Sequence, residues 1–366
     1  MPEQFLHGVE VVEIDSGVRP IRTVKSSVIG AVGTAPDADD TTFPLDTPVL
    51  IAGRLSEAAK LGKAGTLYKA MQGIFDQAGA MVVVIRVAEG SDAAETTSNI
   101  IGDVDSGTGA YTGIKALLSA KSIAKVEPRV IIAPGFSEQA AIAAALVSAA
   151  ERLHAVTILD GPNTNDAEAI SFRETINSRR AYIIDPQVKI WDTEADAEVN
   201  DPASSRVAGM IAKSDNERGF WWSPSNQPIY GITGTVRPVD FKLGDTNCRA
   251  NHLNENEVTT IIQEDGYRLW GNRTCSSDPK WAFLNVVRTA DLIQDSLQRA
   301  HLWAVDRNIT KTYIEDVTAG VNAYLRHLTQ IGAILGGECW ADPELNTPTQ
   351  LQAGKVYFDF DFTPPA

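Results

Sequence analysis

The sequence predicts an α/β domain with a mostly parallel sheet, followed by a smaller α+β domain. Short apolar runs rich in Val and Ile recur along residues 24–185, and helix-like segments separate them. After residue 251 the predicted strands and helices are grouped instead of alternating, which is typical of an α+β domain. With 366 residues, the chain is long enough for two domains that each bury their own core.

Five apolar runs supply the strands of the first domain. They are predominantly apolar, as expected for strands buried on both faces of a sheet. The runs are SSVIGAV (26–32), MVVVIRV (81–87), RVIIAP (129–134), AVTILD (155–160) and AYIID (181–185). Residues 67–77 and 137–153 have helical spacing, with Ser137 as a candidate N-cap. This repetition of strand, helix and strand predicts parallel pairing.

The alternation of strand-like and helix-like segments ends after Pro186. We expect a helix over 202–218 and then a connector over 223–239, which is rich in Pro, Gly, Ser and Asn. The second domain is expected to contain short strands around Val258 and Tyr267, helices over 286–305 and 314–331, and strands near Ala333 and Lys355. We place the domain boundaries at 23/24, 245/246 and 354/355.

Both ends of the chain carry segments with the alternation of an amphipathic strand. In GVEVVEIDSG, Val9 and Val11 share one face. In KVYFDFDFT, the alternation separates an apolar face from a polar one. The apolar face holds Val356, Phe358, Phe360 and Phe362, and the polar face holds Tyr357, Asp359, Asp361 and Thr363. Strands this hydrophobic at a sheet edge invite pairing with another chain.

Composition excludes several classes of function. The 47 acidic side chains exceed the 32 basic ones by 15, and no basic run is interleaved with aromatic residues, which argues against nucleic-acid binding. The three cysteines lack C-x-x-C spacing and the five histidines lack H-x-x-x-H spacing, so we expect no metal site and no cofactor. Neither a signal peptide nor an apolar run long enough for a membrane anchor is present in the sequence.

Catalytic motifs are weak. No G-x-S-x-G elbow occurs and no phosphate-binding loop lies at a strand-to-helix turn, while the S-x-x-K match at Ser277 is expected by chance. Asp160 and Asp185 are the most enzyme-like residues, because each ends a predicted parallel strand, where open α/β sheets bind ligands. Both are also followed by turn formers, and we favour that structural interpretation. An α/β hydrolase-like enzyme remains an alternative.

The stretch EDGYRLWGNRT (264–274), with KWAF following it, combines aromatic and basic residues with Gly and Asn. Such a mixture is found at carbohydrate-binding sites, so a carbohydrate-binding module is a second alternative. We favour a structural role for Tyr267, Trp270, Arg273 and Trp281, in which the aromatic rings fill a core and the arginine anchors polar pairs.

Several longer blocks resemble the tail sheath proteins of contractile bacteriophages, closest to the branch of temperate phages and R-type pyocins. The blocks are HGVEVVEIDSGVRPI, ILDGPN, GFWWSPSNQPIYGITGTVRPV, EDGYRLWGNRTCSSDPKWAF, WAVDRNITKTYIEDVT and DPELNTPTQLQAGKVYF. The resemblance extends from residue 5 to about residue 362. It implies a structural subunit, with no catalysis, in hexameric rings that stack helically and contract to drive a tail tube through a bacterial envelope.

The resemblance also implies a layout for the chain. Residues 1–23 would form an N-terminal arm, 24–245 an outer α/β domain, 246–354 an inner α+β domain facing the tube, and 355–366 a C-terminal strand with a truncated arm. The inner domain would contain both termini. Implied partners are other copies of the chain, the tail tube protein, and baseplate and tail terminator proteins. No nucleic acid or membrane anchor is implied, and assembly is expected in the cytoplasm of the bacterial host.

Two sets of residues take roles from this resemblance. Val9, Val11, Ile14, Val356, Phe358, Phe360 and Phe362 would exchange strands between subunits. Glu315, Asp316, Arg326 and His327, on a helix over 313–331, would face the tube. The related sheaths continue beyond the last strand into a further arm, whereas this sequence stops at Ala366, so the chain is expected to be largely monomeric or to form only small or irregular assemblies.

Overall fold

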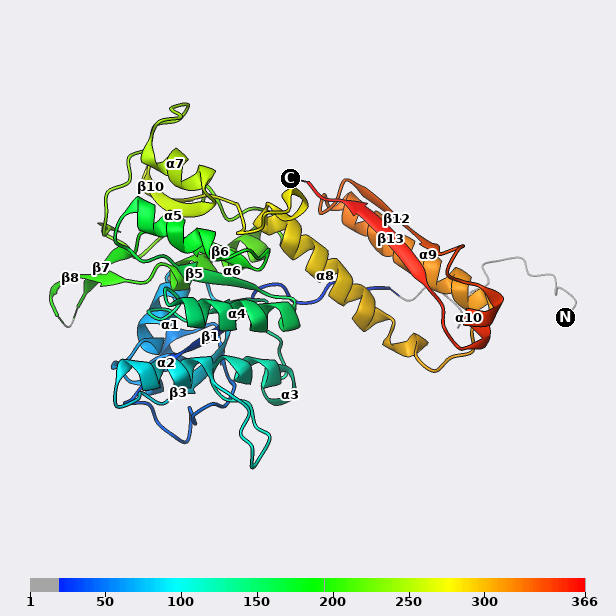
Figure 1. Cartoon of the computed structure of the whole chain (residues 1–366), viewed down its shortest axis with the longest axis horizontal. Coiled ribbons are helices and arrows are strands. Elements are labelled where there is room, and N and C mark those ends of the chain that lie inside the picture. The colour runs from blue at the N-terminus through cyan, green and yellow to red at the C-terminus, as the bar shows by residue number, and fades with distance from the viewer. Residues whose placement is uncertain (1–19, 194, 366) are drawn as a thin grey trace, which may run out of the picture. The chain divides into compact units, whose positions relative to one another are not determined.

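The computed structural model describes residues 20–193 and 195–365 (Figure 1). Val9, Val11 and Ile14, which we expect to exchange strands, lie outside the described residues. The chain forms two compact units, a large one over Val24–Ile293 and a small one over Gln294–Pro365 that also includes residues 20–23. Each unit is described by itself below.

The large unit is built on an eight-stranded sheet with the strand order β11-β10-β6-β5-β4-β1-β3-β2. Its strands are β1 (Val28–Thr34), β2 (Val49–Ala52), β3 (Met81–Val87), β4 (Val130–Ile132), β5 (Val156–Asp160), β6 (Ala181–Ile184), β10 (Val258–Gln263) and β11 (Tyr267–Trp270). The central strands pair in parallel, and the two edge strands, β2 and β11, pair antiparallel to their neighbours. The predicted parallel sheet is thus confirmed.

Helices cover both faces of this sheet. They are α1 (Leu67–Phe75), α2 (Ala93–Ile101), α3 (Ala120–Ile123), α4 (Ala140–Leu153), α5 (Asp166–Glu174), α6 (Ser204–Glu217) and α7 (Arg249–Glu255), with short 3-10 helices η1 (Leu55–Leu61), η2 (Gly113–Ser119) and η3 (Pro279–Trp281). Successive strand residues face opposite sides, so Val82 and Val84 join the core under α1 and α6, whereas Val83 joins the core under α4. Burial on both faces explains the uniformly apolar strands.

A second, three-stranded sheet of the large unit has the order β8-β7-β9. Its strands are β7 (Val188–Asp192), β8 (Ala197–Asp201) and β9 (Gly234–Thr235). Val188 and Ile190 of β7 join the core on the α1 and α6 side of the large sheet. The segment 223–239, predicted as a connector, contains β9 and otherwise lacks helices and strands.

Buried arginine–aspartate pairs join distant parts of the large unit. Arg180, which precedes β6, bonds Asp291 of α8 and also Glu151 of α4. The side chain of Arg180 is 2% exposed and that of Asp291 is 7% exposed. Two further pairs of this kind are Arg237–Asp185 and Arg288–Asp215, and Arg206 forms a more local buried pair with Asp201. A buried charge without its partner is costly, so these pairs stabilise one packing arrangement over others.

The described part of the small unit contains the end of one helix, two further helices, a short 3-10 helix and a two-stranded sheet. The helix α8 (Leu284–Ala300) begins in the large unit, and its last residues belong to the small one. It is followed by η4 (Leu302–Ala304), α9 (Lys311–Gln330), β12 (Gly336–Ala341), α10 (Pro348–Gln352) and β13 (Phe358–Thr363). β12 and β13 pair antiparallel, and α9 packs against β12.

Three sequence-based expectations differ from the structure. The predicted boundary at 245/246 is displaced, because β10 and β11 extend the large sheet and the division falls after Ile293. The helix expected over 286–305 ends at Ala300. Ser137 does not cap α4, whose N-cap is Gln139, because its hydroxyl group bonds Asp160 instead.

We expect Arg180→Ala to lower the free energy of unfolding by ~3–5 kcal/mol, because it leaves the carboxylate of Asp291 buried without a partner. Urea denaturation followed by circular dichroism measures this change. The control is Arg179→Ala at the neighbouring position, where the half-buried guanidinium group lies 4.4 Å from the centre of the Trp281 ring. Losing that contact is expected to cost about 1 kcal/mol or less. Equal effects of the two changes would contradict the assignment.

Candidate functional site

The apolar face of β13 lines a groove in the small unit. The groove has a volume of about 370 Å³. Its lining residues come from the end of α8, from η4 and its flanks, from α9 and from the sheet: Leu297, Gln298, His301, Ala304, Val305, Tyr313, Val317, Val321, Cys339, Val356, Phe358 and Phe360. Three of the four residues predicted to share this face therefore lie together. The ring of the fourth, Phe362, stacks on that of Phe360, with centroids 6.4 Å apart.

The groove is incompletely covered. Phe360 is 38% exposed and Val305 is 62% exposed, although both line the groove. Leu302 and Leu335, elsewhere in the small unit, are 75% and 67% exposed. Exposed apolar side chains that line one groove, such as Phe360 and Val305, are typical of an interaction site.

The backbone of β13 also presents an outward edge. Paired residues of antiparallel strands alternate between bonded and non-bonded pairs. The amide of Asp342 donates to the carbonyl oxygen of Tyr357 (3.1 Å), so the bonded pairs fall at every second residue from that point. Phe358, Phe360 and Phe362 occupy the non-bonded positions, and their N–H and C=O groups point away from β12. In the described part of the chain, no hydrogen-bond partner meets them.

The residues predicted to face the tube lie on α9. Glu315 is exposed and forms an ion pair with Lys311 at 3.7 Å. Asp316 lines a polar hollow of about 480 Å³ at the start of the helix. Arg326 and His327 are exposed near the other end. The helix therefore presents acidic groups near its start and cationic or titratable groups near its end.

The aromatic and basic block belongs to the large unit. Trp270 is half-buried and its ring meets that of Phe241 at 4.7 Å, edge to face. The Tyr267 hydroxyl donates to the carbonyl oxygen of Thr233 (2.9 Å), and the guanidinium group of Arg273 lies 5.6 Å from the centre of the Phe283 ring. Trp281 stacks under Arg179. These side chains contact their own unit and do not form a shared platform.

Asp160 and Asp185, the two aspartates at strand ends, connect neighbouring segments of the fold through hydrogen bonds and an ion pair. Asp160 is 1% exposed and accepts hydrogen bonds from the Ser137 hydroxyl (3.0 Å), the Ser204 hydroxyl (2.6 Å) and the Ser204 amide (2.9 Å). These contacts join β5 to the start of α6. Asp185 is fully buried beside Arg237 and accepts from the amide of Asn163 at 2.8 Å. Both carboxyl groups are therefore held by contacts within the large unit.

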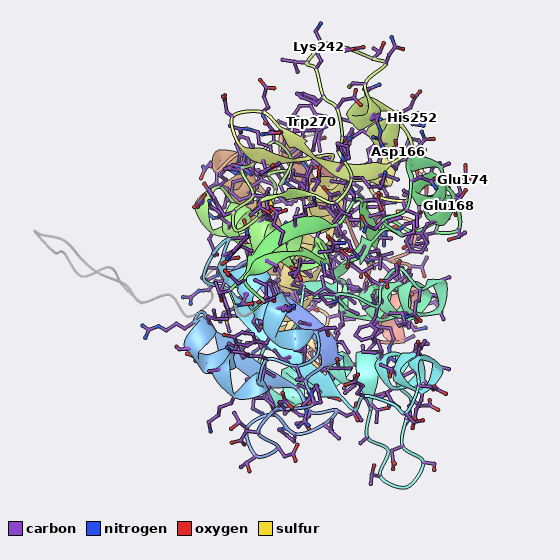
Figure 2. The ribbon with its side chains drawn as sticks, turned by 90° about the vertical axis from the view of Figure 1, so that its left-hand side faces the viewer. Asp166, Glu168, Glu174, Lys242, His252 and Trp270 are labelled. Carbon is purple, nitrogen blue, oxygen red and sulfur yellow. The ribbon has the colours of Figure 1, made fainter. Side chains whose placement is uncertain are left out.

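Arg237 and Arg249 also share Asp166, which begins α5. The two guanidinium groups lower the pKa of Asp166 by hydrogen bonding, Arg249 most strongly. Figure 2 shows Asp166, Glu168 and Glu174 of α5 at the same end of the large unit as His252 of α7 and Trp270. The ion pairs of Asp166 with Arg237 and Arg249 connect the segment after β9 to α5 and α7.

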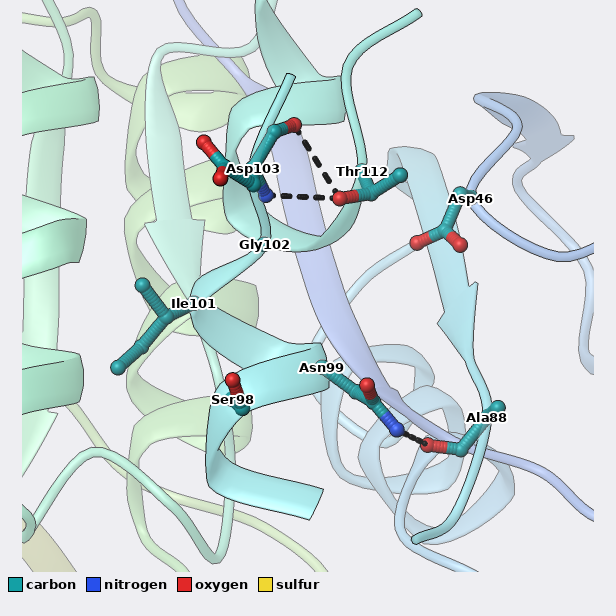
Figure 3. A pocket seen from close by; sticks show the side chains of 8 residues that line it. All are labelled: Asp46, Ala88, Ser98, Asn99, Ile101, Gly102, Asp103 and Thr112. Atoms are coloured by element: carbon teal, nitrogen blue, oxygen red, sulfur yellow. Dashed lines mark hydrogen bonds between the residues drawn. The ribbon is translucent and has the colours of Figure 1, made fainter. Parts of the chain in front are cut away.

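A hollow of about 350 Å³ lies beside the end of β3 (Figure 3). Its polar groups bond one another: the Asn99 side chain donates to the carbonyl oxygen of Ala88 (3.0 Å), and the Thr112 hydroxyl accepts from the amide of Asp103 (2.7 Å). Asp46 accepts from the amide of Gly113 at 2.8 Å, and burial raises the pKa of its carboxyl group. The hollow is a junction of loops and holds no nucleophile activated by a base.

Within residues 20–193 and 195–365, no group of three or more His, Cys, Asp and Glu residues is placed to hold a metal ion. None of the described helices is both long and apolar enough to cross a membrane.

Three family models match the chain. They are the phage tail sheath protein central domain over residues 109–275, the phage tail sheath C-terminal domain over 276–366, and the N-terminal region of domain III of the tail sheath protein Gp18 over 26–87. The chain belongs to the phage tail sheath family. Proteins of this family are structural, and the resemblance seen in the sequence is confirmed.

Tail sheath proteins of known phages and prophages are similar in sequence to nearly the whole chain. A putative prophage major tail sheath protein of Pseudomonas aeruginosa (strain UCBPP-PA14) is 46% identical over 99% of this chain and 94% of the relative. The tail sheath protein of Escherichia phage P2 is 41% identical over 98% of this chain and 92% of the relative.

Solved sheath structures share the fold. The anti-feeding prophage helical sheath in its contracted state has a TM-score of 0.72 and 17% identity, covering 100% of this chain and 97% of that one. The sheath complex of an extracellular contractile injection system, also contracted, has a TM-score of 0.70 and 17% identity over 100% and 96% of the two chains. Both support a mixed α/β fold common to contractile sheaths.

We expect Asp160→Asn to change how the stability of the large unit depends on pH. Burial raises the pKa of Asp160 from 3.8 to about 7, so between these values the folded chain holds a proton that the unfolded chain releases. This contribution is fully present below about pH 4 and is lost as pH rises through about 7, by up to ~1.4 kcal/mol per pH unit.

Urea denaturation of the wild type and the variant at pH 5, 6 and 7 measures the effect as a falling difference between their stabilities. Asp166→Asn is the control, because the pKa of Asp166 is lowered and its contribution is lost only at more acidic pH. A constant difference for Asp160→Asn would contradict the protonated state of the buried carboxyl group.

Proposed function

We propose that this sheath protein forms hexameric rings that stack helically around a tail tube and contract to drive the tube through a bacterial envelope. The observation that carries the proposal is the open edge of β13 beside the uncovered apolar groove of the small unit. A two-stranded sheet is marginal by itself. Strands from neighbouring subunits would extend it and cover the groove.

Strand addition suits a sheath that changes shape. Backbone hydrogen bonds supply affinity, and the alternating side chains set the register, so neighbouring subunits stay connected while their larger surfaces rearrange. The donor segments we propose include Val9, Val11 and Ile14 of other copies. The large unit would form the outer layer and the small unit the inner one, facing the tube.

Further partners follow from the same assignment. We propose that α9 contacts the tail tube through Glu315, Asp316, Arg326 and His327, and that the sheath ends meet baseplate and tail terminator proteins. Two solved structures that share the fold come from the baseplate of the anti-feeding prophage, which supports a baseplate contact. Assembly is proposed in the host cytoplasm, before the particle is released.

Phe360→Glu is expected to reduce the number of sheathed particles by at least ~10-fold, because a carboxylate in the groove resists burial by an incoming strand. The measurement is electron microscopy of particles produced with the variant in place of the natural sheath. The matched control is Trp340→Glu, because Trp340 is equally exposed at 38% but lies on the opposite face of the same sheet. If Phe360→Glu folds and still yields normal sheaths, the groove is not the interface.

Reversing the charge of Glu315 and Asp316 together, by substitution with Lys, is expected to weaken binding of the sheath to isolated tubes by ~10-fold or more. Co-sedimentation with purified tubes measures this loss. Glu168 and Glu174 of α5 provide a control with the same charge change on the large unit (Figure 2). Equal binding by both double variants would remove α9 from the tube contact.

A further inference from the structure

The side-chain amide of Asn322, in the middle of α9, pairs with the backbone of β12. Its Nδ2 donates to the carbonyl oxygen of Cys339 (2.8 Å), and its Oδ1 accepts from the amide of Cys339 (2.8 Å). These are the two bonds that a residue of a neighbouring strand would form. Asn322 therefore occupies the place of a strand.

The bonding pattern of the sheet shows which edge is occupied. Cys339 pairs with Phe360 at a non-bonded position, so its N–H and C=O groups point away from β13. Cys339 also lies near the centre of β12 (Gly336–Ala341). Asn322 thus caps the outer edge of β12 at its middle, whereas the outer edge of β13 meets no partner in the described residues.

Two observations argue that this cap is a built feature. Asparagine is a poor helix former, because its amide competes for backbone hydrogen bonds, yet Asn322 lies well inside a helix of 20 residues. Cys339 is buried at 3% exposure, so a backbone group left unpaired there would have little water to bond. Any strand arriving at β12 must first displace bonds that are already made.

We propose that Asn322 closes the edge of β12, so that the sheet accepts strands only along β13. This inference rests on the proposed exchange of strands between sheath subunits. The occupant is the segment 8–14 of a second copy, in which Val9 and Val11 share one face. Its apolar side chains would lie over Phe360 and Val305, the exposed residues of the groove. The cap therefore sets a single direction for growth of the sheet.

The test uses the full chain and an excess of a synthetic peptide with the sequence of residues 5–18, carrying a benzophenone group at position 9. Photo-crosslinking and mass spectrometry locate the peptide, and native mass spectrometry counts it. With the wild type, we expect one peptide per chain, crosslinked within 358–363. With Asn322→Ala, we expect two, the second crosslinked within 336–341.

Asn346→Ala is the matched control. The side-chain amide of Asn346 forms the same two bonds with the backbone of Tyr357, the residue before β13. It donates to the carbonyl oxygen of Tyr357 (2.8 Å) and accepts from the amide of Tyr357 (2.8 Å). The backbone groups of Tyr357 point towards the β12 side of the sheet, because its carbonyl oxygen also accepts from the amide of Asp342. Losing this amide opens no outer edge, so the count should stay at one.

The outcomes separate two failures. Crosslinks to β12 in the wild type, or a single peptide on Asn322→Ala, would overturn the cap while leaving strand exchange intact. No crosslink to either strand in any variant would instead overturn the exchange of strands itself.

Discussion

Every β-strand carries backbone donors and acceptors along both of its edges, and these groups need partners when water is excluded. The eight-stranded sheet of the large unit meets most of this need internally, because each of its six inner strands lies between two others. Within the described residues the small unit has two strands, so each of them is an edge strand. One of these edges is occupied by a side chain of α9, and the other is presented outward. The assembly chemistry proposed for the sheath follows from that difference.

Buried charge pairs make the large unit a defined body. Four arginines each form an ion pair with an aspartate from another helix, strand or loop: Arg180, Arg206, Arg237 and Arg288. Pairs of this kind add little net stability compared with apolar packing, but a shifted arrangement would leave charges unpaired. They therefore suit a subunit that has to keep its shape while its contacts with neighbours change.

Much of the fold could be predicted from the sequence, because the buried strands leave a strong signal. The runs at 81–87 and 155–160 are almost entirely apolar, as expected for strands covered on both faces. The placement of β10 and β11 was not predicted, because a short hairpin after a connector carries no mark of the sheet it joins. The alternation of 355–363 was visible, and the structure gathers Val356, Phe358 and Phe360 at one groove.

Other features left no readable pattern. Asn322 is a single polar residue inside an amphipathic helix, and nothing near it in the sequence indicates that its amide meets Cys339. Ser137 precedes a helix and fits an N-cap, but in the fold its hydroxyl group donates to Oδ2 of Asp160 (3.0 Å) and its oxygen accepts from the amide of Asp160 (2.9 Å). Contacts between residues far apart in the chain decide both cases, and local spacing does not report such contacts.

The aspartates of β13 have a consequence for solubility. An open strand edge can pair with the same strand of another copy, and identical hydrophobic edges readily join into aggregates. In β13, however, Asp359 and Asp361 alternate with the phenylalanines. When two such strands meet in register, antiparallel about Phe360 or parallel, carboxylates face carboxylates, and like charges directly opposite each other are destabilising. The exposed edge thus discriminates against copies of itself and remains available to a strand of different sequence.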